Sequence, residues 1–256
     1  MLFSDYEPCT YQRNQLLEVI CQLRFPTILT INEQMPAAFQ EAVRGQFPQF
    51  SVRTERVPVR PGQPVPEKPM TVQNYQFISA DGKWKLNLTQ NFLALSTVAY
   101  TDWHTFAGKL DEPLGHFIQI YKPAYFERLG LRYMNGISRL SLGLETVAWN
   151  DLIQPAWLGI LEEEDVPEQT VLRAGTDAEM LLPGQVRLKA HSGPGRLKRQ
   201  GSQEPELRFI LDFDLSTQGK LAVAQVPGTL ETLHDNANRV FQGAITIRLH
   251  EAMEPM

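Results

Sequence analysis

Hydrophobic and polar residues follow two different periods along this chain, and each period predicts one kind of element. Where they alternate, as at Trp84, Leu86 and Leu88, a half-buried strand is expected, because successive side chains on a strand point to opposite faces. Alternating or continuously apolar runs predict strands at residues 16–25, 72–79, 83–89, 92–100, 126–140, 169–182, 185–191 and 206–215. The turn Ala80-Asp81-Gly82-Lys83 should join the second and third of these as a hairpin.

Apolar residues at steps of three and four predict helices. The longest begins after a cap at Thr101 or Asp102 and carries a broad apolar stripe that opens with Trp103 and Phe106. Because proline has no backbone N–H to donate, Pro113 should kink or break this helix near residues 109–112. Further helices are expected at residues 33–47, at 150–162 and from 228 or 229 to 245.

The predicted elements fall into two halves with the same order: a strand, a helix, three or four strands and a long helix. The leading strands share a Leu-Arg-aromatic tripeptide, Leu23-Arg24-Phe25 in the first and Leu131-Arg132-Tyr133 in the second. We therefore predict an α+β fold in which residues 1–122 and 123–256 form two similar antiparallel sheet-plus-long-helix halves, packed side by side as one compact pseudo-two-fold body. Residue identity between the halves is weak, so chance similarity is the alternative. Prolines at residues 57–69 predict an extended loop.

Composition limits the classes of protein without indicating an activity. A chain of 256 residues with 43% hydrophobic content can bury a sizeable core, and its net charge of −5 argues against a basic nucleic-acid footprint along the whole chain. Cys9 and Cys21 cannot build a disulfide framework, so both are expected to be thiols in a reducing cytosol. With neither a signal peptide nor an apolar run long enough to cross a membrane, we expect a cytoplasmic protein without membrane contact.

The most concentrated charge is a basic segment around Ser192-Gly193-Pro194-Gly195. Its cationic or titratable side chains are Arg187, Lys189, His191, Arg196, Lys198 and Arg199. The first three should share one face of a strand, and the others should lie on a loop. This segment could bind the phosphates of nucleic acid or nucleotide, or an acidic protein surface. Because it lacks an aromatic platform for bases, the alternative is a hairpin tip whose charges only keep it soluble.

Asp212 and Asp214 lie two residues apart on a predicted strand and therefore point to the same face. Such a pair can hold a divalent cation or divide the roles of acid and base. No third ligand can be assigned, and Arg208 lies nearby, so a solvated charged face is the alternative. The histidines lack the spacing of a zinc site, and the chain has no nucleophile elbow, phosphate loop or dinucleotide fingerprint. We therefore expect no metal and no cofactor.

Arg24 and Arg132 occupy matching places in the two leading strands. Each could pair with a carboxylate across the sheet. Alternatively, the two guanidinium groups could line the junction between the halves.

Three stretches of the chain match a known pattern: Asn14 with Leu17-Glu18-Val19 and Arg24-Phe25-Pro26, the aromatic helix from Trp103, and above all the block Arg128-Leu129-Gly130-Leu131-Arg132-Tyr133-Met134-Asn135-Gly136-Ile137. In these stretches the chain resembles a sporadically distributed family of uncharacterised bacterial proteins of about 250 residues. The proline expected before Leu17 is absent, since Gln15-Leu16 stands there. The resemblance implies no catalytic residues. A patchy distribution implies an accessory role, such as defence against phage or conflict with it.

These observations favour a non-enzymatic binding or scaffold protein that engages a macromolecular partner, most simply another protein. Two alternatives remain at this stage. A nucleic-acid or nucleotide binder would use the basic loop at residues 187–199, and a metal-dependent hydrolase would use Asp212 and Asp214. The sequence leaves the oligomeric state open.

Overall fold

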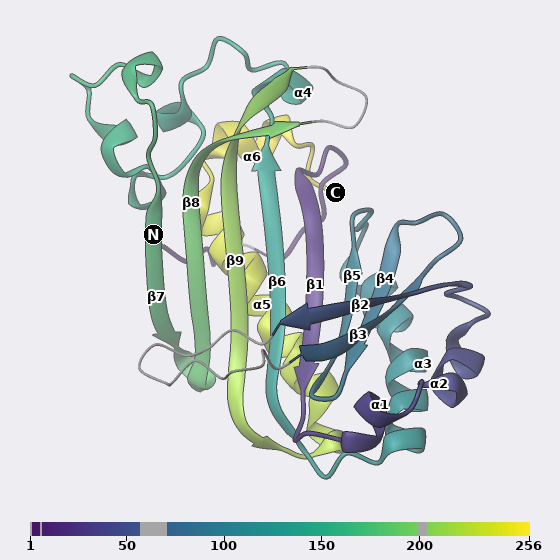
Figure 1. The fold of residues 1–256 in the computed structure, drawn as a ribbon. Coiled ribbons are helices and arrows are strands. Elements are labelled where there is room, and N and C mark those ends of the chain that lie inside the picture. Colours follow the sequence, from purple (N-terminus) through teal and green to yellow (C-terminus); the bar gives the residue numbers. More distant parts are fainter. Residues whose placement is uncertain (1, 6, 57–70, 199–203) are drawn as a thin grey trace, which may run out of the picture.

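The computed structural model describes residues 2–5, 7–56, 71–198 and 204–256, and its centre is one antiparallel sheet of nine strands (Figure 1). The strands are β1 Leu16–Arg24, β2 Gln49–Arg56, β3 Thr71–Ile78, β4 Trp84–Thr89, β5 Phe92–Thr97, β6 Phe126–Ile137, β7 Thr176–Leu182, β8 Val186–Lys198 and β9 Pro205–Leu221. Their order across the sheet is β2-β3-β4-β5-β1-β6-β9-β8-β7. The mixed α and β content and the single antiparallel sheet confirm the predicted fold class at that level.

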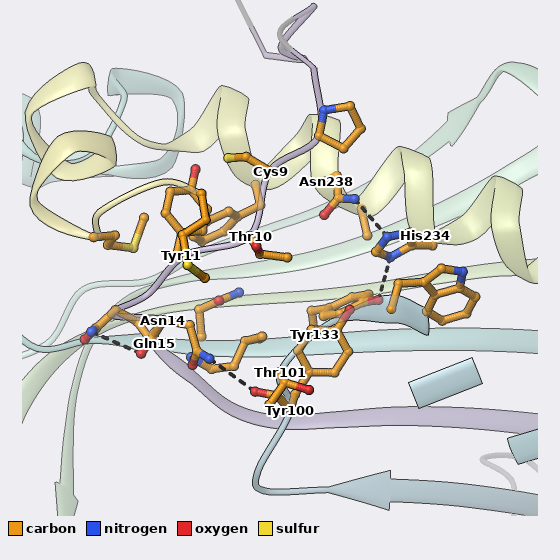
Figure 2. Close-up of a pocket in the computed structure, with 18 residues that line it drawn as sticks. Cys9, Thr10, Tyr11, Asn14, Gln15, Tyr100, Thr101, Tyr133, His234 and Asn238 are labelled. Carbon is orange, nitrogen blue, oxygen red and sulfur yellow. Dashed lines mark hydrogen bonds between the residues drawn. The ribbon is translucent and has the colours of Figure 1, made fainter. Parts of the chain in front are cut away.

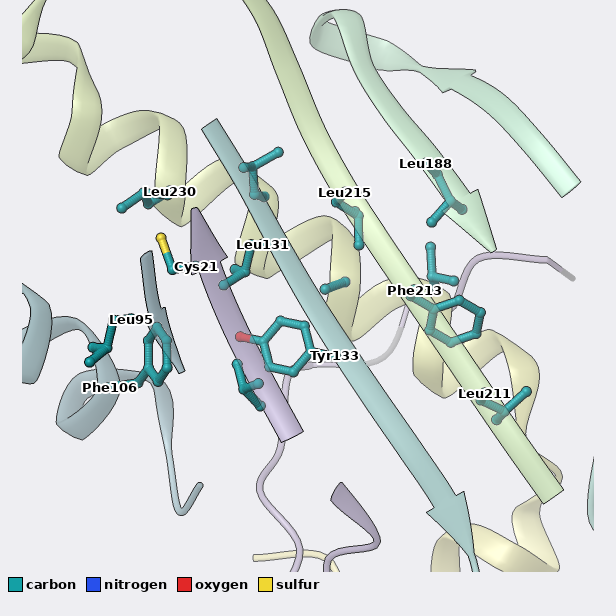
Figure 3. Close-up of a cluster of buried hydrophobic side chains, with 14 of the residues drawn as sticks. Cys21, Leu95, Phe106, Leu131, Tyr133, Leu188, Leu211, Phe213, Leu215 and Leu230 are labelled. Atoms are coloured by element: carbon teal, nitrogen blue, oxygen red, sulfur yellow. The ribbon is translucent and has the colours of Figure 1, made fainter. Parts of the chain in front are cut away.

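The helices are α1 Leu29–Glu33, α2 Ala37–Val43, α3 Trp103–Tyr121, α4 Arg139–Leu142, α5 Val226–Ala244 and α6 Ile247–Ala252. The two long helices, α3 and α5, pack on the same face of the sheet. Phe106 of α3 and Leu230 of α5 lie in one buried cluster with Cys21 and Leu131, which are opposite one another in the pairing of β1 with β6 (Figure 3). Alternation sends the charged residues of these central strands to the other face.

The two central strands are the leading strands of the predicted halves. β1 pairs with β6, β5 lies on the outer side of β1, and β9 lies on the outer side of β6. β5 is followed along the chain by α3, and β9 by α5 after one short 3₁₀ turn. The two ends of the sheet differ, because the first half contributes one more strand than the second.

Several predicted boundaries are wrong. The helix expected at 33–47 is only the shorter α2, with Pro36 as its cap residue, and α1 precedes it and ends at Glu33. The helix expected at 150–162 is a series of 3₁₀ turns, because Pro155 and the left-handed Gly159 interrupt it. The predicted break in the long helix is absent, and α3 continues through the buried Pro113.

Other differences concern strands. β2 was not predicted, because much of it is exposed and its hydrophobic pattern is weak. β7 begins at Thr176, later than predicted, and β8 continues to Lys198, so the expected basic loop is largely a strand. The expected loop at 57–69 lies outside the described residues. Within the described part of the chain, no helix has both the length and the apolar composition needed to cross a membrane.

Candidate functional site

The basic residues of β8 lie beside carboxylates of the neighbouring strand β7. Arg187 forms an ion pair with Glu179, and Lys189 Nζ lies 3.9 Å from the same carboxylate. His191 Nδ1 lies 2.8 Å from Asp177 Oδ1. These partners offset much of the positive field that the sequence suggested.

The far end of the basic segment comprises Arg196 and Lys198. Both are exposed and lie at the end of β8. Arg199 lies outside the described residues. Any phosphate-binding function of this segment would therefore depend mainly on its far end.

The two aspartates of β9 are held by arginines of β6. Arg128 Nη2 donates to both oxygens of Asp214, at 2.8 and 3.0 Å. Arg132 donates to both oxygens of Asp212, with Nε at 2.7 Å from Oδ1. A cation would have to displace these charge-assisted bonds. In the described ranges, no group of three or more histidine, cysteine or acidic side chains could hold a metal ion.

Arg24 and Arg132 do not lie opposite each other. Because β1 and β6 are antiparallel, Arg24 lies opposite Arg128, while Arg132 lies opposite Ile20. Hydrogen bonding to Asp212 raises the pKa of Arg132. Arg132 therefore follows the predicted cross-strand pairing, whereas Arg24 is exposed at the end of β1.

A cavity of about 300 Å³ opens on the helix side of the central strands. We call it the junction cavity, since side chains from both predicted halves meet in it (Figure 2). It is lined by Pro8, Cys9, Thr10, Tyr11, Asn14, Gln15, Leu16, Tyr100, Thr101, Trp103, Tyr133, Asn135, His234, Ala237, Asn238, Phe241, Met253 and Met256.

One wall of the junction cavity is a chain of hydrogen bonds that links α5 to β6. Asn238 Nδ2 lies 3.0 Å from His234 Nε2, and His234 Nδ1 lies 2.8 Å from the hydroxyl of Tyr133. With the amide nitrogen donating to Nε2, the imidazole proton is on Nδ1 and is donated to Tyr133. Tyr133 then keeps its own proton to donate, and the ring of Tyr100 lies against it with centroids 5.7 Å apart.

The side chains of His234, Tyr100 and Tyr133 are uncharged at neutral pH. Burial lowers the pKa of His234 to about 4, although the nearby carboxylate of Glu231 acts in the opposite direction. Burial also raises the pKa of Tyr100 to about 12 and that of Tyr133 well above its ordinary value. Because both nitrogens of His234 are already bonded to protein groups, the ring is poorly placed to act as a general base.

Trp103 fixes the position of His234 from the other predicted half. The two rings stack with centroids 4.5 Å apart and planes 9° apart, and Phe106 stacks against Trp103 at 6.0 Å. Trp103 Nε1 also donates to Glu231 of α5 at 2.8 Å. The start of α3 is thus joined to α5 beside the junction cavity.

The N-terminal and C-terminal segments close another side of the junction cavity. Gln12 N donates to Glu254 O, and Met256 N donates to Thr10 O, each at 2.9 Å. The hydroxyl of Tyr11 lies 2.9 Å from Nδ1 of His250 on α6. The pairing holds residues 10–12 over the ends of the helices.

A second hollow, of about 950 Å³, lies on the other side of Cys9 and Met256, which line both spaces. It carries the carboxylates Asp5 and Glu7. Residue 6, which stands between them in the sequence, is outside the described part of the chain. The junction cavity is the better-defined site.

Sequence reasoning did not find the junction cavity. In the sequence His234 lies on the apolar side of a predicted helix, which indicates a half-buried core residue. Its burial agrees with that, but the sequence does not indicate its stacking on Trp103. The available signal was Tyr133 and Asn135, polar residues that alternate with Arg132 and Met134 and hence lie on the buried face of β6.

Comparison with models of known protein families found no match, and a search of curated proteins found none either.

Proposed function

We propose that the protein is a non-enzymatic binding protein and that the junction cavity holds its ligand, a small uncharged molecule. The observation that carries this proposal is the chemistry of the lining, since none of its described side chains is an aspartate, glutamate, lysine or arginine. A charged ligand would lose its hydration there without gaining an ionic partner. The volume lies at the lower end of the range for small-molecule sites.

The proposal can be tested by filling the cavity. Ala237 lies in its wall and is 4% exposed, so Ala237→Phe should fill part of the space. Thr232→Phe adds an aromatic ring to an exposed position of the same helix and serves as the control. Neutral fragments detected by ligand-observed NMR should bind the wild type and the control but not Ala237→Phe.

A second cavity-filling variant keeps the test valid if Ala237→Phe does not fold. Thr10→Trp adds bulk from the N-terminal segment, where burial is only partial. Circular dichroism should show that the variants are folded. Fragments that bind equally well to both filled variants, or that fail to bind the wild type, would rule out the junction cavity as the ligand site.

A macromolecular partner remains our second proposal. It is favoured by the face of the sheet opposite α5, where charged side chains of β6, β9, β8 and β7 lie side by side. Binding of nucleic acid would rest mainly on Arg196 and Lys198. A cytoplasmic location and a role in phage defence or conflict are also proposals, and the second rests on the family resemblance alone.

We also propose that the two halves arose by duplication. Both long helices have 19 residues. Leu110, Leu114 and Phe117 are buried in α3, and the residues at the same positions of α5, Leu233, Ala237 and Val240, are buried as well. Superposing residues 16–122 on 126–250 should align β1 with β6 and α3 with α5. Unrelated positions of the leading strands after superposition would contradict the duplication.

A further inference from the structure

Hydrogen-bonding groups in the junction cavity restrict the ligand further, provided that the proposed function is correct. The chain from Asn238 through His234 to Tyr133 has a direction. Asn238 donates to His234 and His234 donates to Tyr133. The hydroxyl proton of Tyr100, whose ring lies against Tyr133, has no acceptor among the residues that the structure describes. A ligand that offers an acceptor would satisfy it.

Two amide oxygens complement this donor. Asn135 is only 3% exposed, and its Nδ2 donates to Leu211 O at 3.3 Å. Its Oδ1 has no hydrogen-bond partner among the residues that the structure describes. Asn238 uses its nitrogen on His234, and its oxygen points away from that ring (Figure 2). A ligand that covered these oxygens and shielded them from water would leave them unpaired unless it offered donors, so both oxygens call for donors on the ligand.

Two other amide side chains of the lining are already engaged. Asn14 donates to Tyr100 O and accepts from Leu16 N. Gln15 donates to Arg13 O and accepts from Ser138 N. Around the unpaired groups the wall is rich in rings, which favour a flat aromatic ligand. The aromatic side chains of the lining are Tyr11, Tyr100, Trp103, Tyr133 and Phe241.

We infer that the junction cavity binds a neutral heteroaromatic ring that carries two N–H donors and one acceptor, the chemistry of a free nucleobase. The donors would face Asn135 and Asn238, and the acceptor would face Tyr100. A nucleotide should be excluded, because no described side chain of the lining is a lysine or arginine that could balance the charge of a phosphate.

Matched probes test the inference by isothermal titration calorimetry. Uracil and adenine should bind, whereas 1,3-dimethyluracil, which keeps the ring but loses both donors, should bind at least about tenfold more weakly. Adenosine monophosphate should not bind. Tyr100→Phe removes only a hydroxyl and should lower the affinity for uracil by about tenfold. Tyr125→Phe lies outside the lining and should leave the affinity for uracil unchanged.

The outcomes separate the two proposals. One outcome is that neutral fragments bind the wild type but not Ala237→Phe, while uracil and adenine do not bind. In that case, or if 1,3-dimethyluracil binds as well as uracil, the ligand class is wrong and the binding site stands. If uracil binds equally well to Tyr100→Phe, the assigned donor is wrong and the inference is overturned. If no neutral fragment occupies the cavity, the proposed function itself fails.

Discussion

His234 shows how burial of a single residue makes stability depend on pH. Its pKa falls from 6.5 to about 4 in the folded protein, so between these values the unfolded chain binds a proton that the folded protein excludes. This contribution to stability is complete above pH 6.5 and is lost as the pH falls toward 4. We predict that His234 alone lowers the free energy of unfolding by about 2 kcal/mol between pH 7.5 and pH 5.

Urea denaturation at the two pH values measures this effect, and His234→Gln is the comparison. The variant should lose less stability than the wild type on acidification, by about the same 2 kcal/mol, because glutamine does not titrate. Equal losses in the two proteins would show that His234 is not held neutral by its site.

Gly130 is needed in β6 because of its neighbour two residues earlier. A Cβ at this position would overlap the guanidinium group of Arg128, which lies over Gly130 on its way to Asp214. Gly130→Ala should therefore break that ion pair and cost about 1 kcal/mol, the usual scale for a partly exposed pair. In denaturation experiments, Asp214→Asn should then cost less in the Gly130→Ala background than in the wild type. Additive costs would contradict this account.

At the scale of elements, two helical glycines should respond to the same substitution in opposite ways. A Cβ at Gly243 of α5 would meet the backbone of Leu2 and Phe3, whereas a Cβ at Gly115 of α3 would meet nothing within 4 Å. Gly115→Ala should stabilise the protein by about 0.5–1 kcal/mol through helix propensity. Gly243→Ala should displace the N-terminal segment.

Limited proteolysis and thermal melting distinguish these outcomes. Gly243→Ala should be cut faster near its N-terminus than the wild type and should gain no stability, while Gly115→Ala should melt at a higher temperature. Similar protection of the N-terminus in both variants would mean that the segment does not depend on its contact with α5.

The success of sequence reasoning also varied from element to element. Alternation located β4, β6 and β9, because each has one face buried and the other polar. It missed β2, where much of the strand is exposed and no periodic burial marks it. At 150–162 the helical spacing of apolar residues was real, since Trp149, Leu152 and Trp157 are buried, but a proline and a left-handed glycine changed the backbone.

For the whole molecule, the junction cavity could not be predicted because its wall comes from distant parts of the chain. The N-terminal segment, the start of α3, β6, α5 and the C-terminal segment each contribute a few residues. Each residue has an ordinary local explanation, as His234 did on the apolar side of a helix. Only the tertiary arrangement brings the unpaired amide oxygens and the aromatic rings together.

The arrangement of the whole molecule also decides where a polyanion could bind. Since Arg187 and Lys189 share Glu179 and His191 faces Asp177, we predict that any such binding depends on Arg196 and Lys198. Reversing both to glutamate should abolish it and leave the melting temperature unchanged, because exposed charges contribute little to stability. Reversing Arg187 and Lys189 instead should have a smaller effect on binding.

Binding of RNA and DNA at two salt concentrations tests this prediction. Affinity that depends on the end of β8 should fall steeply with salt, because each phosphate contact releases condensed counterions. Affinity that survives the Arg196→Glu, Lys198→Glu double variant without a salt dependence would remove this segment from the mechanism. The charged face formed by β6, β9, β8 and β7 would then be the surface to test against protein partners.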